Sequence, residues 1–365
     1  MPASPEKLPE LNIPPSQHTV HVSIIDTTSH VNDVRTKNFM DPPMPGLEIL
    51  STPSYAFSIK RTDPSNPTKY DHLIFDLGIR KDWEQGPKVL AEGAKSGRYT
   101  LVVEKNVIDI LREHGDDPKD DHTGDPSTFP PTTDLIVGPG FKKRFVPAYP
   151  TVPNSSIDEN AYKDRNLREI DFATEGNGLK LGRYNAFDFY GDGSFYLIEA
   201  PGHTGNHMCA LARTCAEPPE FILMGGDIAH HGGEFRPTKW LPIPDQIDPS
   251  PLAPPYAQNA PVCPGELFEA IHPKRSSTEP YTQLIGPIHE DVELAGKNLG
   301  HFQEFDAQPG VFAVIAHDAS LRDVVEFYPA EANGWKGKGL GEQGRWRFLR
   351  DFDLPEGEGQ EKSAL

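Results

Sequence analysis

The chain has 365 residues, and at roughly 150 residues per domain this suggests about two domains or one large one. Acidic residues outnumber Lys and Arg by 54 to 35, so the net charge is −19 and neither nucleic acid nor an anionic membrane surface is an expected partner. Three cysteines encode no disulfide framework, and no stretch approaches ~18 consecutive apolar residues. These features predict a reduced, cytoplasmic protein, and they leave its oligomeric state open.

Apolar periodicity and turn residues predict alternating strands and helices along the chain. The predicted strands span residues 18–26, 54–61, 72–78, 134–140, 207–213, 220–227 and 311–320, with a hairpin over 187–203 that turns at Gly191-Asp192-Gly193. The predicted helices span 107–115, 265–273, 289–305 and 345–352. Such a pattern is typical of an α/β sandwich whose polar residues gather along one sheet edge.

The remaining segments are rich in proline or charge. Residues 1–17 predict a flexible leader, and 353–365 predict a disordered tail, which leaves 18–352 as one domain. A charged loop is expected from about 147 to 181. The Pro-rich stretch 237–264 predicts a long surface loop that could act as a lid over a site.

Histidine and aspartate follow directly after three of the predicted strands. The segments are PGHTGNH at 201–207, GGD at 225–227 and AHD at 316–318, and a fourth polar segment, DHTGD, lies at 121–125. Rigid strands would present these imidazoles and carboxylates together at one edge. Two His and two Asp from separate strand ends are a normal ligand set for zinc or a similar divalent ion.

Taken in chain order, which is DHTGD, PGHTGNH, GGD and AHD, the four segments resemble the metallo-β-lactamase-fold hydrolases. The resemblance is closest to their fungal lactonase- and lactamase-like members. The resemblance implies an αββα four-layer sandwich with one or two Zn²⁺ ions. His203 would bind the first metal and Asp227 would bridge both, while Asp121, His122 and His317 would hold the second. Metal-bound hydroxide would open a small-molecule lactone or lactam, and Asp121 would be the catalytic residue that orients it and manages a proton.

One motif departs from the family pattern, which is HxHxDH. Aligned on His122, the two expected histidines fall on Asp117 and Lys119, as though roughly ten residues were deleted. An ammonium group is no metal ligand at neutral pH. With five ligands remaining, the second metal position is predicted to fill first, and zinc would saturate near one equivalent. Thioester hydrolysis by the same fold and a catalytically inactive or truncated family member are the alternatives.

The other histidines receive secondary roles. His207 is expected to support His203, and Asp76 is expected to support the metals from the end of an early strand. His230 and His231 are interpreted mainly as exposed loop residues that could line a substrate pocket. Structural roles are expected for six further histidines, namely His18, His21, His72, His272, His289 and His301.

Overall fold

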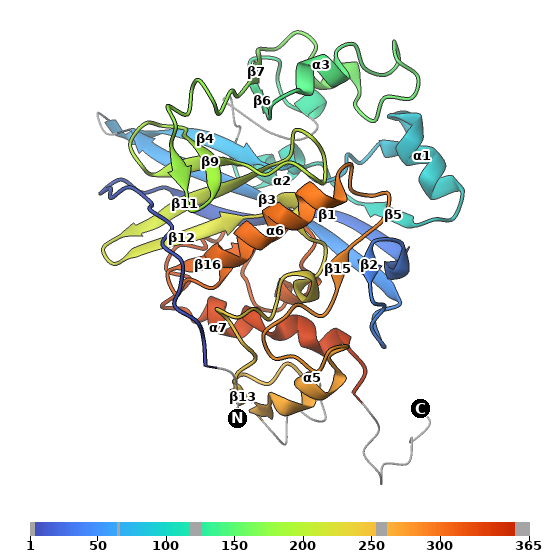
Figure 1. Cartoon of the computed structure of the whole chain (residues 1–365). Helices are drawn as coiled ribbons and strands as arrows, with labels where there is room; N and C mark the ends of the chain where they lie inside the picture. Colours follow the sequence, from blue (N-terminus) through green and yellow to red (C-terminus); the bar gives the residue numbers. More distant parts are fainter. Residues whose placement is uncertain (1–3, 64–65, 117–125, 253–260, 355–365) are drawn as a thin grey trace.

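The computed structural model describes residues 4–63, 66–116, 126–252 and 261–354. Its centre is a pair of β-sheets packed face to face (Figure 1). The first sheet has the antiparallel order β4-β3-β1-β5. Its strands are β1 (His21–Arg35), β3 (Ile49–Asp63), β4 (Asn66–Phe75) and β5 (Thr100–Val103).

The second sheet has six strands in the order β16-β12-β11-β10-β9-β8. Its strands are β8 (Lys180–Leu181), β9 (Tyr184–Asp188), β10 (Phe195–Glu199), β11 (Met208–Ala216), β12 (Pro219–Met224) and β16 (Val311–Val314). Neighbouring strands are antiparallel except for β12 and β16, which are parallel. The predicted hairpin is present, because β9 and β10 pair across the turn that contains Gly191 and Gly193.

Side chains that alternate along the strands build the core between the two sheets. Phe57 and Ile59 of β3 point inward, and the intervening Ser58 points to the opposite face. On the second sheet, Leu197 and Ile222 face the first sheet from β10 and β12. All four apolar residues are fully buried or nearly so, which supplies the main driving force for packing the sheets together.

Helices cover the outer faces and complete four layers, so the expected αββα sandwich is confirmed. Helix α6 (Val292–Asp306) lies across the outer face of the six-stranded sheet (Figure 1). Its residues Leu299 and Phe302 pack against that sheet in one apolar cluster. On the other side, helix α2 (Val107–Glu113) buries Ile108 and Leu111 against the first sheet. Gly115 follows α2 with φ +82°, as expected for a residue that terminates a helix.

Short elements surround this sandwich. The helices are α1 (Lys88–Lys95), α3 (Phe141–Phe145), α5 (Glu266–Ile271) and α7 (Leu340–Arg345). The strands are β2 (Met40–Asp41), β6 (Leu135–Val137), β7 (Leu167–Glu169), β13 (Gln246–Ile247), β14 (Cys263–Pro264) and β15 (Gln283–Leu284). Residues 347–351, predicted to be α-helical, form a 3₁₀ helix instead.

Two segments that were expected to be peripheral pack against the domain. Leu11, in the predicted leader, is 8% exposed and packs with the α6 side of the six-stranded sheet, and its carbonyl accepts a hydrogen bond from the Gly182 N–H. In the predicted surface loop 237–264, Ile243, Ile247 and Cys263 are buried in an apolar cluster. Both predictions gave too much weight to proline content, because scattered apolar residues are enough to anchor an extended segment.

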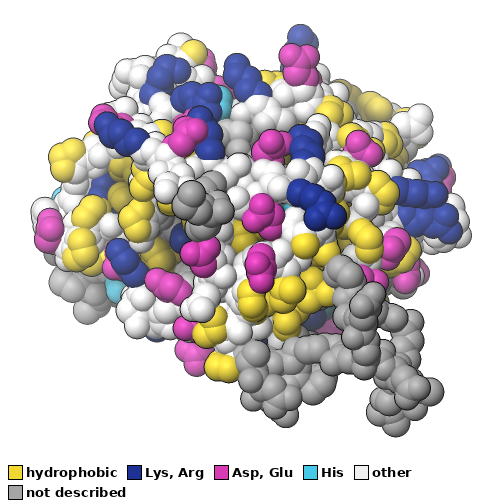
Figure 2. Space-filling model, turned by 60° about the horizontal axis from the view of Figure 1, so that its bottom comes forward, with side chains coloured by type: hydrophobic (Ala, Val, Ile, Leu, Met, Phe, Trp, Pro, Cys, Tyr) yellow, Lys and Arg dark blue, Asp and Glu magenta, His cyan; other side chains and the backbone are white. Residues whose placement is uncertain are grey.

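The negative charge is dispersed over the face shown in Figure 2, where Asp and Glu side chains alternate with Lys and Arg. Such interspersed charge favours solubility over the recognition of one strongly charged partner. Among the described residues, no helix is long and apolar enough to cross a membrane.

A buried ion pair ties the loop after β12 to the end of α6. The Arg236 guanidinium donates to both carboxylate oxygens of Asp306 at 2.7 and 2.5 Å, and its third contact is the Arg345 carbonyl at 2.9 Å. Arg236 is 4% exposed and Asp306 is 2% exposed. Removal of one partner would therefore leave a buried charge without compensation.

We expect Asp306→Ala to lower the free energy of unfolding by about 3–5 kcal/mol, because the Arg236 guanidinium would stay buried without its anion. Urea denaturation followed by circular dichroism measures this. The matched control is Lys297→Ala, at an exposed position of the same helix, which should change stability by no more than about 0.5 kcal/mol. A loss below about 1 kcal/mol for Asp306→Ala would contradict this account.

Candidate metal centre

The parallel strands β12 and β16 end side by side, and the candidate site lies just beyond their ends. The Gly225 N–H donates to the Val314 carbonyl at 2.8 Å, and the Ala316 N–H donates to the Gly226 carbonyl at 3.0 Å. These bonds extend the pairing past the last strand residues. They fix the backbone of Asp227 next to that of His317.

The Asp227 carboxylate lies between two imidazoles. His317 Nε2 is 2.9 Å from one carboxylate oxygen, and His203 Nε2 is 3.5 Å from the other. The sequence therefore predicted correctly that these three side chains meet. Asp121 and His122, the other two predicted ligands, lie outside the described residues.

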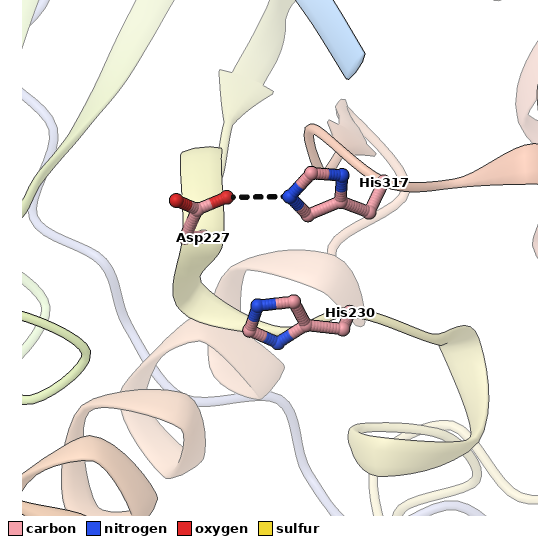
Figure 3. Close-up of side chains that lie close together, drawn as sticks. All are labelled: Asp227, His230 and His317. Carbon is pink, nitrogen blue, oxygen red and sulfur yellow. Dashed lines mark ion pairs between the residues drawn. The ribbon is translucent and has the colours of Figure 1, made fainter. Parts of the chain in front are cut away.

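Neighbouring groups orient the His317 ring and the loop that carries Asp227. His317 Nδ1 donates to the Pro53 carbonyl at 2.8 Å, so Nε2 points toward Asp227 (Figure 3). The His207 ring lies beneath the loop. Its Nδ1 donates to the Ala200 carbonyl at 2.9 Å, and its Nε2 accepts the Asp227 N–H at 3.0 Å. Both ring nitrogens of His207 are thus used, which agrees with the expected supporting role, although the residue it supports directly is Asp227.

The electrostatics favour an ionised carboxylate beside a protonated imidazole. Burial alone would raise the pKa of Asp227, but the hydrogen bond and charge of His317 hold it well below its usual value. Burial alone would lower the pKa of His317, but the bond to Asp227 and its charge raise it to about 9. A divalent cation could replace the His317 proton, because both would use the same nitrogen lone pair and the same carboxylate.

The structure adds His230 to the site. Its side chain is 9% exposed and stacks on His317 with ring centroids 5.3 Å apart and planes inclined by 11°. Ligand atoms of Asp227, His230 and His317 lie within 4.8 Å of one another, and they form the one group with this geometry in the described ranges (Figure 3). The interpretation of His230 as an exposed loop residue is therefore wrong. The Glu234 carboxylate accepts the His230 N–H at 2.5 Å and turns the loop inward.

His289 is the second residue that sequence reasoning placed outside the site. It is 5% exposed, and its ring contacts those of His203 and His230 with centroid distances of 5.4 and 5.7 Å. For His230, the short distance in sequence from Asp227 was a usable signal. No comparable signal exists for His289, which lies three residues before α6 and reaches the site only because that helix crosses the sheet.

A glycine allows the His203 turn to approach α6. Gly202 has φ +140°, and a Cβ at this position would lie 2.3 Å from the Ala295 backbone nitrogen. The Asp291 N–H donates to the Gly202 carbonyl at 3.0 Å, and the Glu290 N–H donates to that of His203 at the same distance. The turn is therefore held against the start of the helix, where His289 is also located.

A cavity of about 420 Å³ opens beside Asp227. Asp76, Asp227 and His207 contribute polar groups to its wall. Burial and the nearby Asp227 charge raise the pKa of Asp76 to about 6. The rest of the lining is largely apolar and includes Leu90, Leu135, Ile136, Val137, Phe141, Ile157 and Met208. A pocket with apolar walls and a few convergent polar groups is the usual form of a small-molecule site.

Comparisons with known proteins agree with this geometry. The chain is 46% identical over 357 residues to gamma-lactamase FDB1 of Fusarium pseudograminearum (strain CS3096), and the match covers 94% of this chain and 85% of that protein. It is 37% identical to metallo-hydrolase mfmC of Annulohypoxylon moriforme, over 96% of this chain and 92% of the relative. No protein-family model matches the chain.

Among solved structures, a quorum-quenching N-acyl homoserine lactone hydrolase superposes with a TM-score of 0.52 at 11% sequence identity, covering 87% of this chain and 99% of that structure. This similarity supports the metallo-β-lactamase fold. The chain belongs to the fungal family of hydrolases that includes gamma-lactamase FDB1 and metallo-hydrolase mfmC. It is a hydrolase of the metallo-β-lactamase fold.

Because His207 supports the loop that carries Asp227, its removal should have two separate effects, one on stability and one on metal affinity. We expect His207→Ala to lower the free energy of unfolding by about 1–3 kcal/mol, because the Ala200 carbonyl and the Asp227 N–H lose a buried partner. If the site binds a divalent metal ion such as Zn²⁺, its affinity should fall by about 10–100-fold, because Asp227 is no longer held in place. Urea denaturation and competition with a chromophoric chelator measure the two effects.

The comparison variant is Asp227→Asn, which keeps the backbone N–H that His207 accepts but should lose the metal ion, and its metal-free stability should also fall at neutral pH because His317 loses its carboxylate partner. If His207→Ala lowered stability and left the zinc affinity unchanged, the orienting role of His207 would be wrong.

Proposed function

We propose that this protein is a zinc-dependent hydrolase that opens cyclic amide or ester bonds in small molecules. The observation that carries the proposal is the Asp227 carboxylate placed between His203 and His317 at the edge of an apolar cavity. The relatives named gamma-lactamase and metallo-hydrolase support a lactam or lactone as the substrate class.

The side chains present suit a divalent cation of zinc type. They offer a carboxylate and several imidazoles, and buried nitrogens of His203, His230 and His289 have no hydrogen-bond partner in the described ranges. We propose Asp227 and His317 as metal ligands, joined by His203 and by the sequence-predicted Asp121 and His122. When bound, such a cation polarises a scissile carbonyl and activates water. The chain itself orients Asp227 through His207 and holds His317 through the Pro53 carbonyl.

The cavity indicates what kind of substrate fits. Phe141 and Met208 offer apolar contact area, Asp76 and Asp227 contribute carboxylates, and the ion pair of Arg80 with Asp158 adds a second charged part of the wall. A lactam or lactone with an apolar ring system or acyl group would bury that part against the apolar wall. Its carbonyl would then face the carboxylate and imidazole side, where water is activated.

Loss of the proposed metal ligand Asp227 should abolish hydrolysis. We expect Asp227→Ala to lower kcat/KM for a responsive lactam or lactone at least 100-fold, because the carboxylate shared by both proposed metal positions is removed. The test is a panel of lactams, lactones and thioesters assayed by ring opening or thiol release, with zinc content measured in parallel. His21→Ala is the matched control, since His21 is half-exposed and pairs with Glu331 far from the site.

A zinc-loaded protein that hydrolyses only the thioesters would replace the proposed substrate class with the alternative one. A protein that binds zinc and hydrolyses none of the panel would support the alternative that this chain is a catalytically inactive family member.

The departure from HxHxDH predicts impaired turnover. Asp117 and Lys119 stand where the pattern has histidines, so the first metal position lacks two expected imidazoles. We expect insertion of a strand-plus-HxH segment between Asp120 and Asp121 to raise both lactamase or lactonase activity and thermal stability. An insert of equal length with both histidines replaced by alanine is the control. Turnover by the unmodified chain at a typical enzyme rate of ~10 per second would contradict the prediction.

A further inference from the structure

Three imidazoles from separate segments form a contiguous cluster beside Asp227, and one of them, His230, also stacks on His317. His203 follows β10, His230 follows β12, and His289 precedes α6. Their ring centroids are 5.3, 5.4 and 5.7 Å apart, so the rings occupy the corners of a nearly equilateral triangle. Sequence reasoning assigned a metal to only one of the three, His203.

Within the part of the chain that the structure describes, four ring nitrogens of this cluster are buried without a hydrogen-bond partner. They are Nδ1 of His203, Nδ1 of His230 and both nitrogens of His289. Two histidines with a structural role differ from this cluster, although the buried His301 also has an Nδ1 without a partner among the described residues. His207 and His272 use both ring nitrogens in hydrogen bonds to the backbone. Buried polar atoms in folded proteins nearly always have a partner, so the unpartnered nitrogens of the cluster point to a missing ligand.

We propose that His230 and His289 act with His203 as imidazole ligands of a divalent cation beside Asp227, at the metal position for which this sequence lacks the HxH histidines. The proposal rests on the proposed metal-dependent function and adds two ligands to it. Three imidazoles at zinc–nitrogen distances of ~2.0–2.1 Å in a tetrahedral arrangement place ring centres about 5 Å apart. The observed triangle is close to this size.

The rings need a rotation to complete the site. Among the described residues, His230 is the one member of the cluster whose ligand atom lies within 4.8 Å of the ligand atoms of both Asp227 and His317. Neither ring nitrogen of His289, nor the Nδ1 of His203 or His230, makes a hydrogen bond to any described residue, so rotation of these rings breaks few of the contacts seen. A cation would draw these nitrogens toward one centre, and His230 lies where it can join either metal position.

Metal titration of the full chain, first stripped with a chelator, tests the proposal. Co²⁺ binding is followed by visible absorption and Zn²⁺ binding by competition with a chromophoric chelator. The five ligands predicted from sequence should bind one metal ion per chain. With the histidine cluster as additional ligands, the expected stoichiometry is two metal ions per chain. We expect His289→Leu and His230→Ala each to weaken one of the two equivalents at least 100-fold and to change the Co²⁺ spectrum.

The stability of the metal-free variants separates a ligand from a structural residue. His289→Leu replaces a ring with two unpartnered nitrogens by an apolar group, so metal-free stability should be unchanged or higher. A structural histidine should behave in the opposite way. His72→Ala is the buried control, since it removes the hydrogen bond with Ser58 far from the site and should lower stability while leaving both equivalents intact.

Saturation near one equivalent that neither variant changes would overturn the inference and leave the proposed function standing, provided that the wild-type chain hydrolyses the panel. Unchanged metal binding with a raised KM in His230→Ala would also overturn it, because the cluster would then contact substrate. Absence of any metal binding together with absence of hydrolysis would overturn both proposals.

Discussion

The site depends on keeping an ionised carboxylate at the end of a buried strand. Asp227 follows the fully buried Met224 by three residues and its side chain is 35% exposed, and the hydrogen bond and charge of His317 hold its pKa well below the usual value. An anion in such a place is stable only when hydrogen bonds and opposite charge replace its water. His317 supplies both through a single contact of 2.9 Å.

The architecture serves this requirement. Parallel pairing of β12 with β16 brings two strand ends to the same edge of the sheet, which adjacent antiparallel strands do not. The backbone bonds from Gly225 and Ala316 then carry the pairing into the loops. Helix α6 closes the other side, since Gly202 lets the His203 turn lie directly on its backbone. Residues distant in sequence are thereby held in one rigid frame, as precise ligand geometry requires.

Histidines in this frame fall into two groups according to their ring nitrogens. His207 has both nitrogens hydrogen-bonded, and it positions the loop that carries Asp227. His230 and His289 are more deeply buried, yet they have ring nitrogens without a partner among the described residues. The difference is physical. An imidazole with both nitrogens hydrogen-bonded is a structural element, whereas one with an unpartnered nitrogen can offer a lone pair to a cation or a substrate.

The sequence by itself determined the period-2 strands, the Gly191–Gly193 hairpin, the helix that ends before Gly115, and the meeting of His203, Asp227 and His317. Each of these follows from local pattern or from a resemblance carried by contiguous motifs. Tertiary structure alone decided the burial of Leu11 and the placement of His230 and His289 against His317 and His203. The physical reason is that burial of an isolated side chain depends on what packs over it. For His289 this is the path of α6 across the sheet, which no local sequence pattern encodes.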